Sequence, residues 1–470
     1  MPDDLRIRSD MGRLLHAVLR HWRNEERSHK LLSELLLYRP AVRAAGGPQH
    51  AARYLLEQAL AELGKLHPSD AQLLEMRYWD GLGVEQVANL YGYAESTIYG
   101  RQSLAFERLS ALVEDREQNA WRNRERHVEH RMQVPYSDKL VGVEHEISTI
   151  GALLSAPTGP WIVALEGIGG IGKTTLAAQL VRRLYARTDF EDFAWVSAQP
   201  RALDVAGCIQ GKPCPTLSAQ GLVDSLVTQL MPDTAGALLA APEKALQALE
   251  ERLKWAPHLI IIDNLETVAD IDALMPKIEG LINPSKFLLT SRRRVTQHAV
   301  FNHTMRELTF QEACTLVRSE AALRNLQALV VASDDDLAPI YETVGGNPLA
   351  LLLITGQTYL RPLRSIIADL REAKGVAIDN LYTFIYRDAW EHLSESARRV
   401  LLAMPLAPVQ GEGPEYLATI CELATPEVVS ALRDLTTQSL VQVYGDLNQR
   451  RFKIHSLTRT FLLQQVLAWT

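Results

Sequence analysis

The chain has 470 residues, which is enough for about three domains. Its hydrophobic fraction of 47% and charged fraction of 22% are ordinary for a globular protein, and a net charge of −7 gives no overall attraction to nucleic acid or anionic membranes. The longest apolar run, near residues 349–355, is far shorter than a membrane span, and the acidic N-terminus lacks the apolar segment of a signal peptide. Four cysteines without a C-x-x-C pair do not support a zinc site and suit a reducing compartment. We therefore expect a cytoplasmic protein without membrane attachment.

Residues 1–130 show helical spacing of apolar side chains throughout, so we expect an all-α N-terminal domain. One predicted helix carries an apolar stripe at residues 31–36 and is expected to end at Pro40. A later helix is expected to be capped by Ser69 or Asp70, because short polar side chains accept hydrogen bonds from free N–H groups at a helix start.

A helix-turn-helix is predicted within residues 66–112. A short helix at 84–91 precedes a turn at Gly92 and a second helix that begins near residue 94. This stretch resembles the DNA-reading helix-turn-helix of bacterial sigma factors and related response regulators, through the shared pattern Val-x-x-Val-Ala-x-x-x-Gly-x-x-x-x-Thr-Ile/Val.

If this motif reads DNA, the exposed side chains of its second helix would make the contacts. We predict that they are Glu95, Ser96, Thr97, Tyr99, Arg101 and Gln102. The charge argues against strong binding, because residues 61–131 contain nine Lys and Arg against twelve Asp and Glu, and phosphate neutralisation normally supplies most of the affinity. The alternative is a helical domain that binds a protein partner. The charged stretch at 116–131 predicts a solvated helix or linker.

The central domain, residues 135–310, is organised around a phosphate-binding motif. Residues 167–174 fit G-x-x-x-x-G-K-[ST], between a buried strand at 161–165 and a following helix. Lys173 can reach the β- and γ-phosphates, and the Thr174 hydroxyl can ligate Mg²⁺. The alternative is a Gly-rich turn without a ligand. We predict nucleotide binding by the backbone N–H groups and side chains of Gly167, Gly169, Gly170, Ile171, Gly172, Lys173, Thr174 and Thr175.

Alternating strand and helix patterns in this domain predict a parallel sheet covered by helices. Asp263 ends a strongly apolar strand, at the edge where open α/β sheets bind ligands. We predict that Asp263 holds Mg²⁺ directly or through water; alternatively, it caps the following turn. Arg292 follows the strand at 286–290 and is predicted to point at the γ-phosphate, whereas Arg293 and Arg294 are expected on the surface.

Two further domains are predicted after the sheet. Residues 311–380 form a small helical domain, and residues 381–470 fit a winged helix. The wing would be a hairpin, because residues 440–444 and 451–455 alternate at period two around a Gly- and Asn-containing turn. The expected fold is therefore multidomain, with an all-α domain, a P-loop α/β domain, a helical domain and a winged helix.

From about Leu140 to its end, the chain is similar to the NB-ARC type of STAND ATPases, which are switch proteins of plant immune receptors, apoptosome proteins and many bacterial regulators. The similarity rests on motifs in a fixed order, namely Leu140-Val141-Gly142, the phosphate loop, Phe193–Ser197, Asp263, Thr290-Ser291-Arg292, Gly345–Leu351 and Phe452–Leu457. It implies that Val141, Gly142 and Pro348 contact adenine, that Arg292 contacts the γ-phosphate, and that His455 touches the β-phosphate of ADP.

The chain departs from this family in ways that bear on activity. Val143 replaces the usual arginine after the entry glycine, and Ser456 replaces the usual aspartate after His455. The second acid of the Walker B motif is Asn264, which cannot accept a proton. We therefore expect slow hydrolysis at most, with Lys173 and Asp263 as catalytic residues and Glu266 as a possible substitute base.

The similarity implies an ATP/ADP-controlled switch that is closed with ADP and self-associates with ATP, with Mg²⁺ as cofactor. Its output would pass through the helix-turn-helix region, as transcription control or defence signalling. The alternatives are a nucleotide-regulated DNA-binding transcription factor, an ATPase whose turnover is the function, and a scaffold that recruits an effector protein. No repeat of 20–50 residues is present, so a sensor would be a separate partner, a downstream part, or unnecessary.

Overall fold

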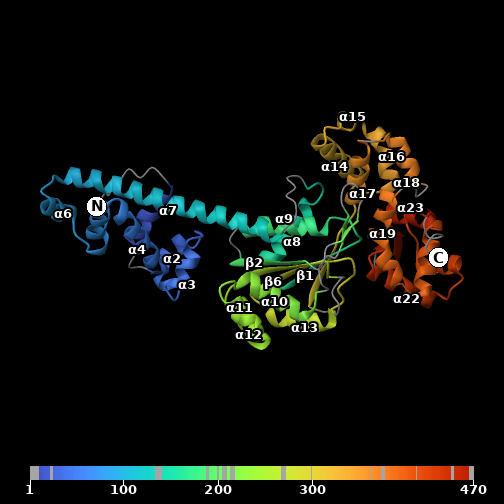
Figure 1. Ribbon diagram of the computed structural model, residues 1–470, viewed down its shortest axis with the longest axis horizontal. Helices are drawn as coiled ribbons and strands as arrows, with labels where there is room; N and C mark the ends of the chain where they lie inside the picture. Colours follow the sequence, from blue (N-terminus) through green and yellow to red (C-terminus); the bar gives the residue numbers. More distant parts are fainter. Residues whose placement is uncertain are drawn as a thin grey trace. The chain divides into compact units, whose positions relative to one another are not determined.

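The computed structural model describes most of the chain. The described ranges are 10–21, 25–132, 140–186, 190–197, 201–203, 209–211, 217–265, 271–297, 299–359, 361–371, 376–408, 410–445 and 449–464. Glu266, the possible substitute base, lies outside them, as do Cys208 and Cys214. The chain divides into two compact units, Met1–Gln133 and Val134–Thr470, which we call the N-terminal unit and the C-terminal unit (Figure 1).

The described part of the N-terminal unit is helical, as predicted (Figure 1). Its helices are α1 (Asp10–Arg20), α2 (Glu25–Leu32), α3 (Tyr38–Ala44), α4 (Pro48–Leu66), α5 (Pro68–Leu74), a π-helical turn (Glu75–Trp79), α6 (Val84–Tyr91) and α7 (Glu95–Met132). The core of the unit forms where the apolar faces of α1, α4 and α7 meet, and Phe106 of α7 is fully buried there. The ring of Phe106 packs edge-on against Tyr78 and His16, with centroids 5.5 and 5.3 Å apart.

The segment between α2 and α3 corrects one expectation. Pro40 lies in the first turn of α3 and does not end a helix. Proline is tolerated there because the first turn needs no backbone N–H donor. The chain leaves the helical path earlier, where the N–H groups of Leu36 and Leu37 donate to the buried Glu117 carboxylate at 2.8 and 3.1 Å. Glu117 belongs to α7, so the charged stretch of that helix is not wholly solvated.

The helix-turn-helix consists of α6, a turn at Gly92 and α7. Gly92 ends α6 in the left-handed conformation at φ 67°, which glycine adopts without steric cost. α5 begins differently from expectation, because Pro68 occupies its first turn and neither Ser69 nor Asp70 caps it. Asp70 instead accepts a hydrogen bond from Arg108 of α7 at 2.5 Å, which ties α5 to the second helix of the motif.

The C-terminal unit contains a five-stranded parallel sheet, which confirms the predicted fold class. The strand order is β2, β5, β6, β1, β7. The strands are β1 (Ile162–Glu166), β2 (Asp192–Ser197), β5 (His258–Asp263), β6 (Lys286–Ser291) and β7 (Val300–Thr304). β6 therefore lies between the strand that leads into the phosphate loop and the strand that ends in Asp263. The register pairs Glu166 with both Ser291 and Thr304, so the carboxyl ends of these strands gather at one edge.

Helices cover both faces of this sheet (Figure 1). α8 (Glu144–Ser155) and α9 (Lys173–Ala186) lie on one side, and α10 (Ala219–Leu230), α11 (Ala235–Leu239), α12 (Pro242–Trp255) and α13 (Ile271–Leu281) lie on the other. Alternate side chains of the strands, such as Ile260 and Ile262, join the core on the α10–α13 side. A short antiparallel ribbon, β3 (Arg201–Leu203) and β4 (Ile209–Gly211), follows β2.

The rest of the C-terminal unit is helical apart from one hairpin. The elements are α14 (Phe310–Leu323), α15 (Gln327–Val330), α16 (Asp334–Val344), α17 (Pro348–Gln357), α18 (Leu363–Arg371), α19 (Val376–Glu391), α20 (Glu395–Ala403), a 3₁₀ turn (Met404–Leu406), α21 (Pro414–Cys421), α22 (Thr425–Thr437), β8 (Val441–Gly445), β9 (Arg450–Ile454) and α23 (Ser456–Gln464). The hairpin β8–β9 is antiparallel, as predicted for a wing. We call residues 376–464 the C-terminal segment; its assignment as a winged helix stays a prediction.

The expected domain boundary at residue 380 falls inside α19, and one hydrophobic core continues across it. Tyr386 of α19 stacks on Phe461 of α23, with ring centroids 4.6 Å apart. Its hydroxyl lies 3.0 Å from the Thr458 hydroxyl, so the polar end of this buried ring is satisfied. Burial raises the pKa of Tyr386 well above its ordinary value. α19 is therefore anchored firmly on the final helix.

Lys286, at the start of β6, is a buried charge in the sheet. Its ammonium donates to the carbonyl oxygens of Leu153 at 2.7 Å and Thr158 at 3.0 Å, and lies 5.2 Å from the centroid of the Trp161 ring. The side chain is 2% exposed, and this burial lowers the pKa of Lys286 to about 8. The lysine thus joins the end of α8 to the sheet.

The stability contribution of Lys286 is expected to rise with pH between about 8 and 10.5. In that window the unfolded chain binds a proton that the folded chain does not, while the neutral amine still donates to both carbonyls. Between pH 7 and 10, the free energy of unfolding of wild type should therefore rise by about 2–3 kcal/mol relative to that of Lys286→Met, because each pKa unit corresponds to about 1.4 kcal/mol. Denaturant unfolding at several pH values checks this, with Lys254→Met, on the exposed face of α12, as the control. A gap between wild type and Lys286→Met that stays constant with pH would contradict it.

Among the described residues, no helix combines the length and the apolar character needed to cross a bilayer. The longest helix, α7, is 38 residues long but is strongly charged along much of its length.

Candidate nucleotide site

The phosphate loop connects β1 to the first residue of α9, as predicted. Lys173 begins α9, and its ammonium donates to the carbonyl oxygens of Gly167 at 2.7 Å and Ile168 at 3.0 Å. Gly170 has a positive φ of 78°, which a side chain would make costly. The backbone N–H groups of the loop and of the first turn of α9, at Thr174 and beyond, are the type of donors that bind phosphate oxygens.

The two predicted Mg²⁺ ligands lie together. The Thr174 hydroxyl donates to Asp263 Oδ1 at 2.7 Å, and the Thr290 hydroxyl donates to the same oxygen at 2.6 Å. Thr290 reaches this position because β6 lies between β1 and β5. One carboxylate and one hydroxyl fit Mg²⁺, which usually binds few protein oxygens and completes its shell with water and phosphate. The hydroxyl of Thr290 was not predicted as a member of this cluster, although Thr290 belongs to the motif that contains Arg292.

Asn264 follows Asp263 in the left-handed conformation, with φ 71°. Asparagine adopts this conformation more readily than most residues. Its backbone N–H donates to the Thr290 hydroxyl at 2.9 Å, which links it to the Asp263 cluster. The position of the usual second acid therefore carries an amide, and the expectation of slow hydrolysis stays a prediction.

The arginines after β6 have two different surroundings. Arg292 lies beside the phosphate loop, since its Nη1 is 3.2 Å from the place that a Cβ on Gly169 would occupy. The same Nη1 is 3.5 Å from the carbonyl oxygen of Ile385 in α19. Arg294 is exposed, as expected, and it also contacts other parts of the C-terminal unit. Its backbone N–H donates to Thr437 at 2.8 Å, and its Nη1 lies 3.5 Å from Glu166.

The start of α17 contacts the phosphate loop directly. The Asn347 amide donates to the carbonyl oxygen of Gly169 at 3.1 Å, and the Leu349 N–H donates to that of Gly170 at 3.2 Å. Pro348 stands between them in the first turn of α17. The motif was predicted to contact adenine through Pro348; its hydrogen bonds to the loop come from the flanking Asn347 and Leu349, which the sequence analysis did not single out.

Val141 and Gly142 precede α8, and Gly142 lies against the start of α14. Its carbonyl oxygen accepts a hydrogen bond from Arg306 at 3.0 Å, and Arg306 also pairs with Glu312 at 2.7 Å. The hydrogen bond from Arg306 lowers the pKa of Glu312 to about 2. Arg306 comes from the segment after β7. Its guanidinium lies beside Gly142, although Val143 occupies the usual arginine position. No motif in the sequence pointed to it.

His455 is buried at the end of β9, with its Nδ1 3.0 Å from Glu307 Oε1. His455 and the start of the phosphate loop both line a cavity of about 320 Å³. Its walls include Glu166 and Gly167 on the sheet side and Lys453 and His455 on the hairpin side. The contact of His455 with a β-phosphate stays a prediction, but His455 and the loop border the same cavity.

The predicted DNA-reading residues of α7 do not all share the exposed face. Ser96, Thr97, Tyr99 and Arg101 are exposed, as is Glu95. Gln102 is fully buried, which corrects the prediction for this residue. It lies four residues after the buried Ile98 and so falls on the same stripe of the helix. Its amide oxygen accepts from Arg77 at 3.1 Å and its amide nitrogen donates to Tyr78 at 2.8 Å.

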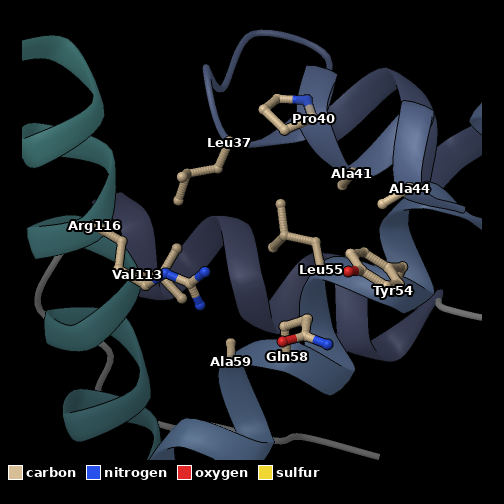
Figure 2. Close-up of a pocket in the computed structure, with 10 residues that line it drawn as sticks. All are labelled: Leu37, Pro40, Ala41, Ala44, Tyr54, Leu55, Gln58, Ala59, Val113 and Arg116. Atoms are coloured by element: carbon tan, nitrogen blue, oxygen red, sulfur yellow. The ribbon is translucent and has the colours of Figure 1, made fainter. Parts of the chain in front are cut away.

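The N-terminal unit has a smaller cavity of its own, of about 230 Å³, between α3, α4 and α7 (Figure 2). The residues that line it are mostly apolar, with Arg116 at one side and Gln58 at another: Leu37, Pro40, Ala41, Ala44, Tyr54, Leu55, Gln58, Ala59, Val113 and Arg116. None of the predicted nucleotide-binding or DNA-binding residues belongs to it.

Comparisons with known proteins agree with both motifs. Residues 143–335 match the NB-ARC domain model, and residues 14–115 match the ECF sigma factor model. The chain is 28% identical over 232 residues to the inactive disease susceptibility protein LOV1 of Arabidopsis thaliana, covering 46% of this chain and 23% of that protein. It is 31% identical over 157 residues to disease resistance protein RPP8 of the same plant, covering 33% of this chain and 15% of that protein.

Among solved structures, a STAND protein with a tetratricopeptide repeat sensor from Pyrococcus horikoshii matches with a TM-score of 0.33 and 17% identity, over 70% of this chain and 43% of that one. The chain thus spans less than a quarter of the length of the plant relatives named above. The domain matches agree with the phosphate loop, the Asp263 cluster and the helix-turn-helix described above. Residues 143–335 of the chain therefore match the NB-ARC domain, and they are preceded by a region similar to ECF sigma factors.

Proposed function

We propose that the protein is a nucleotide-controlled signalling switch whose closed form binds ADP and whose open form binds ATP and self-associates. The observation that carries this proposal is the meeting of three parts of the C-terminal unit at one loop. α17 donates two hydrogen bonds to the phosphate loop, and Arg292 lies between that loop and α19. A change in the bound phosphates would therefore act on contacts that hold the domains together, which is what a two-state switch requires.

In this proposal, Lys173 binds the β- and γ-phosphates, and Thr174 and Asp263 hold Mg²⁺ through their oxygens. Asn264 supports a switch more than a rapid ATPase, because its amide cannot accept a proton from an attacking water. We therefore expect steady-state hydrolysis below about 1 s⁻¹, under the ordinary range for enzymes. Faster turnover would favour an ATPase function over the switch.

The output is proposed to pass through the N-terminal unit. Its similarity to ECF sigma factors supports DNA binding as one route. A second candidate, recruitment of a protein partner, is supported by exposed apolar side chains on the helix-turn-helix, with Leu90 67% and Leu104 43% exposed. A salt-dependent gel shift with sequence preference would favour DNA. Absence of binding at low salt, together with a partner that co-purifies with the full chain, would favour recruitment.

The switch is tested by identifying the nucleotide extracted from purified full-length protein and by measuring its mass in solution with ADP and with ATP. Wild type is expected to contain ADP, to be monomeric with ADP, and to form a larger species with ATP. His455→Ala should increase the larger species at least about fivefold at limiting ATP, because the closed form loses a buried contact at the end of β9.

The exposed His392, which follows α19, gives the control variant His392→Ala, whose mass distribution should equal that of wild type. Identical masses with ADP and ATP for wild type would contradict the switch itself. An unchanged distribution for His455→Ala, with a normal response of wild type, would contradict only the proposed role of His455.

A further inference from the structure

Glu166 is a buried carboxylate at the base of the phosphate loop. It is the last residue of β1 and directly precedes Gly167. The side chain is 3% exposed, and its Oε1 accepts a hydrogen bond from the Thr304 hydroxyl at 2.6 Å. Its backbone carbonyl accepts from the Met305 N–H at 2.8 Å. Glu166 thus joins the start of the loop to the end of β7, in the strand pair that fixes the loop's position.

Arg294 connects this carboxylate to the C-terminal segment. Its guanidinium Nη1 lies 3.5 Å from Glu166 Oε1, and its backbone N–H donates to the carbonyl oxygen of Thr437, at the end of α22, at 2.8 Å. The two contacts belong to one residue, so a shift of α22 moves the charge that faces Glu166. The same short segment carries Arg292, which lies beside Gly169 of the loop.

The pair is also accessible enough to break without unfolding. The Arg294 side chain is 49% exposed. Glu166 lines the cavity of about 320 Å³ whose opposite wall includes Lys453 and His455, and its Oε2 has no hydrogen-bond partner among the described residues. A buried carboxylate with an open oxygen is costly unless positive charge or water compensates it. Lys453 of the β8–β9 hairpin lines the same cavity and brings a positive charge to it.

We propose that Glu166 and Arg294 are a positioning pair, which links docking of the C-terminal segment to the shape of the phosphate loop and thereby slows ADP release. The inference rests on the proposed switch and adds residues that act on the nucleotide only through the loop. When the C-terminal segment moves away, Arg294 moves with Thr437. Glu166 then loses its contact with Arg294 and keeps the hydrogen bond from Thr304.

The test is a double-mutant cycle on the release of a fluorescent ADP analogue from the full-length, Mg²⁺-loaded protein. Glu166→Gln and Arg294→Met should each speed release about fivefold to tenfold, in the usual range of couplings between sites. The double variant should be no faster than either single variant, because both remove the same interaction. Arg294→Lys, which keeps the charge, should restore most of the slow release. A fold defect is distinguished by the melting temperature without nucleotide, which Arg294→Met should leave unchanged.

Arg433→Met is the matched control, because it removes one exposed positive charge from α22 four residues before Thr437. Its release rate should equal that of wild type. Two outcomes would overturn the pair while leaving the switch intact. In one, the fold-increases in release rate of the two single variants multiply in the double variant. In the other, both single variants release the ADP analogue at the wild-type rate. A wild-type protein that does not bind the ADP analogue would overturn the proposed switch and this inference together.

Discussion

Replacing Lys173 by alanine is expected to weaken nucleotide binding by about a hundredfold or more, so that the purified protein contains no ADP. Lys173 is 8% exposed, and its ammonium lies within the loop, where it donates to Gly167 and Ile168. Charged hydrogen bonds to phosphate at a buried site contribute on the order of 2–5 kcal/mol. The variant removes this positive charge but leaves the backbone N–H groups of the loop in place.

The measurement is the nucleotide content of the purified protein and the affinity for a fluorescent ADP analogue. Lys244→Ala removes an exposed lysine on α12 of the same unit and should retain the nucleotide content of wild type. If Lys173→Ala protein kept wild-type ADP content, the phosphate loop would not be the binding site, and the prediction of nucleotide binding by residues 167–175 would be wrong.

Replacing Gly346 by alanine is expected to destabilise the C-terminal unit strongly. A Cβ at this position would lie 2.0 Å from the carbonyl oxygen of Leu308 and 2.6 Å from its nitrogen. These are backbone atoms, and Leu308 is held there because its N–H donates to Gly346 O at 3.0 Å and its carbonyl accepts from Tyr341 at 3.2 Å. The backbone segments at residues 346 and 308 must therefore move apart, at a cost of about 3 kcal/mol in stability.

The same change should weaken nucleotide binding, since Gly346 directly precedes the residues of α17 that contact the phosphate loop. Thermal unfolding and ADP affinity measure the two effects. Gly236→Ala is the control, because a Cβ at Gly236 in α11 meets nothing within 4 Å. Its melting temperature should be equal to or slightly above that of wild type. A Gly346→Ala protein as stable as Gly236→Ala would mean that α17 is not packed on Leu308.

The phosphate loop and the Asp263 strand could be predicted because their chemistry is local. The spacing of Gly167, Gly172 and Lys173 and the apolar strands around them are readable within a few residues. The contacts of Asn347 and Arg294 could not, since each joins residues more than 100 positions apart or in different layers. Periodicity tells which residues are apolar, but it does not tell which loop meets which helix.

Errors in the N-terminal unit have a different origin. Gln102 was predicted among the exposed side chains of the second helix, yet its position one turn after Ile98 puts it in the interior, where Arg77 and Tyr78 satisfy its amide. Asp70 was expected to cap a helix but pairs with Arg108 across the motif. In both places a tertiary hydrogen bond replaced the local role that residue type alone suggested.

The second helix of the helix-turn-helix does not stop at the motif. α7 continues for 38 residues to Met132 and, at about 1.5 Å per residue, is about 57 Å long. A continuous helix keeps its two ends at a set distance and orientation, unlike a Gly/Ser-rich tether whose ends move independently. A rotation of the helix at Met132 would therefore rotate Ser96 and Tyr99 by the same angle, because the helix moves as one rigid rod.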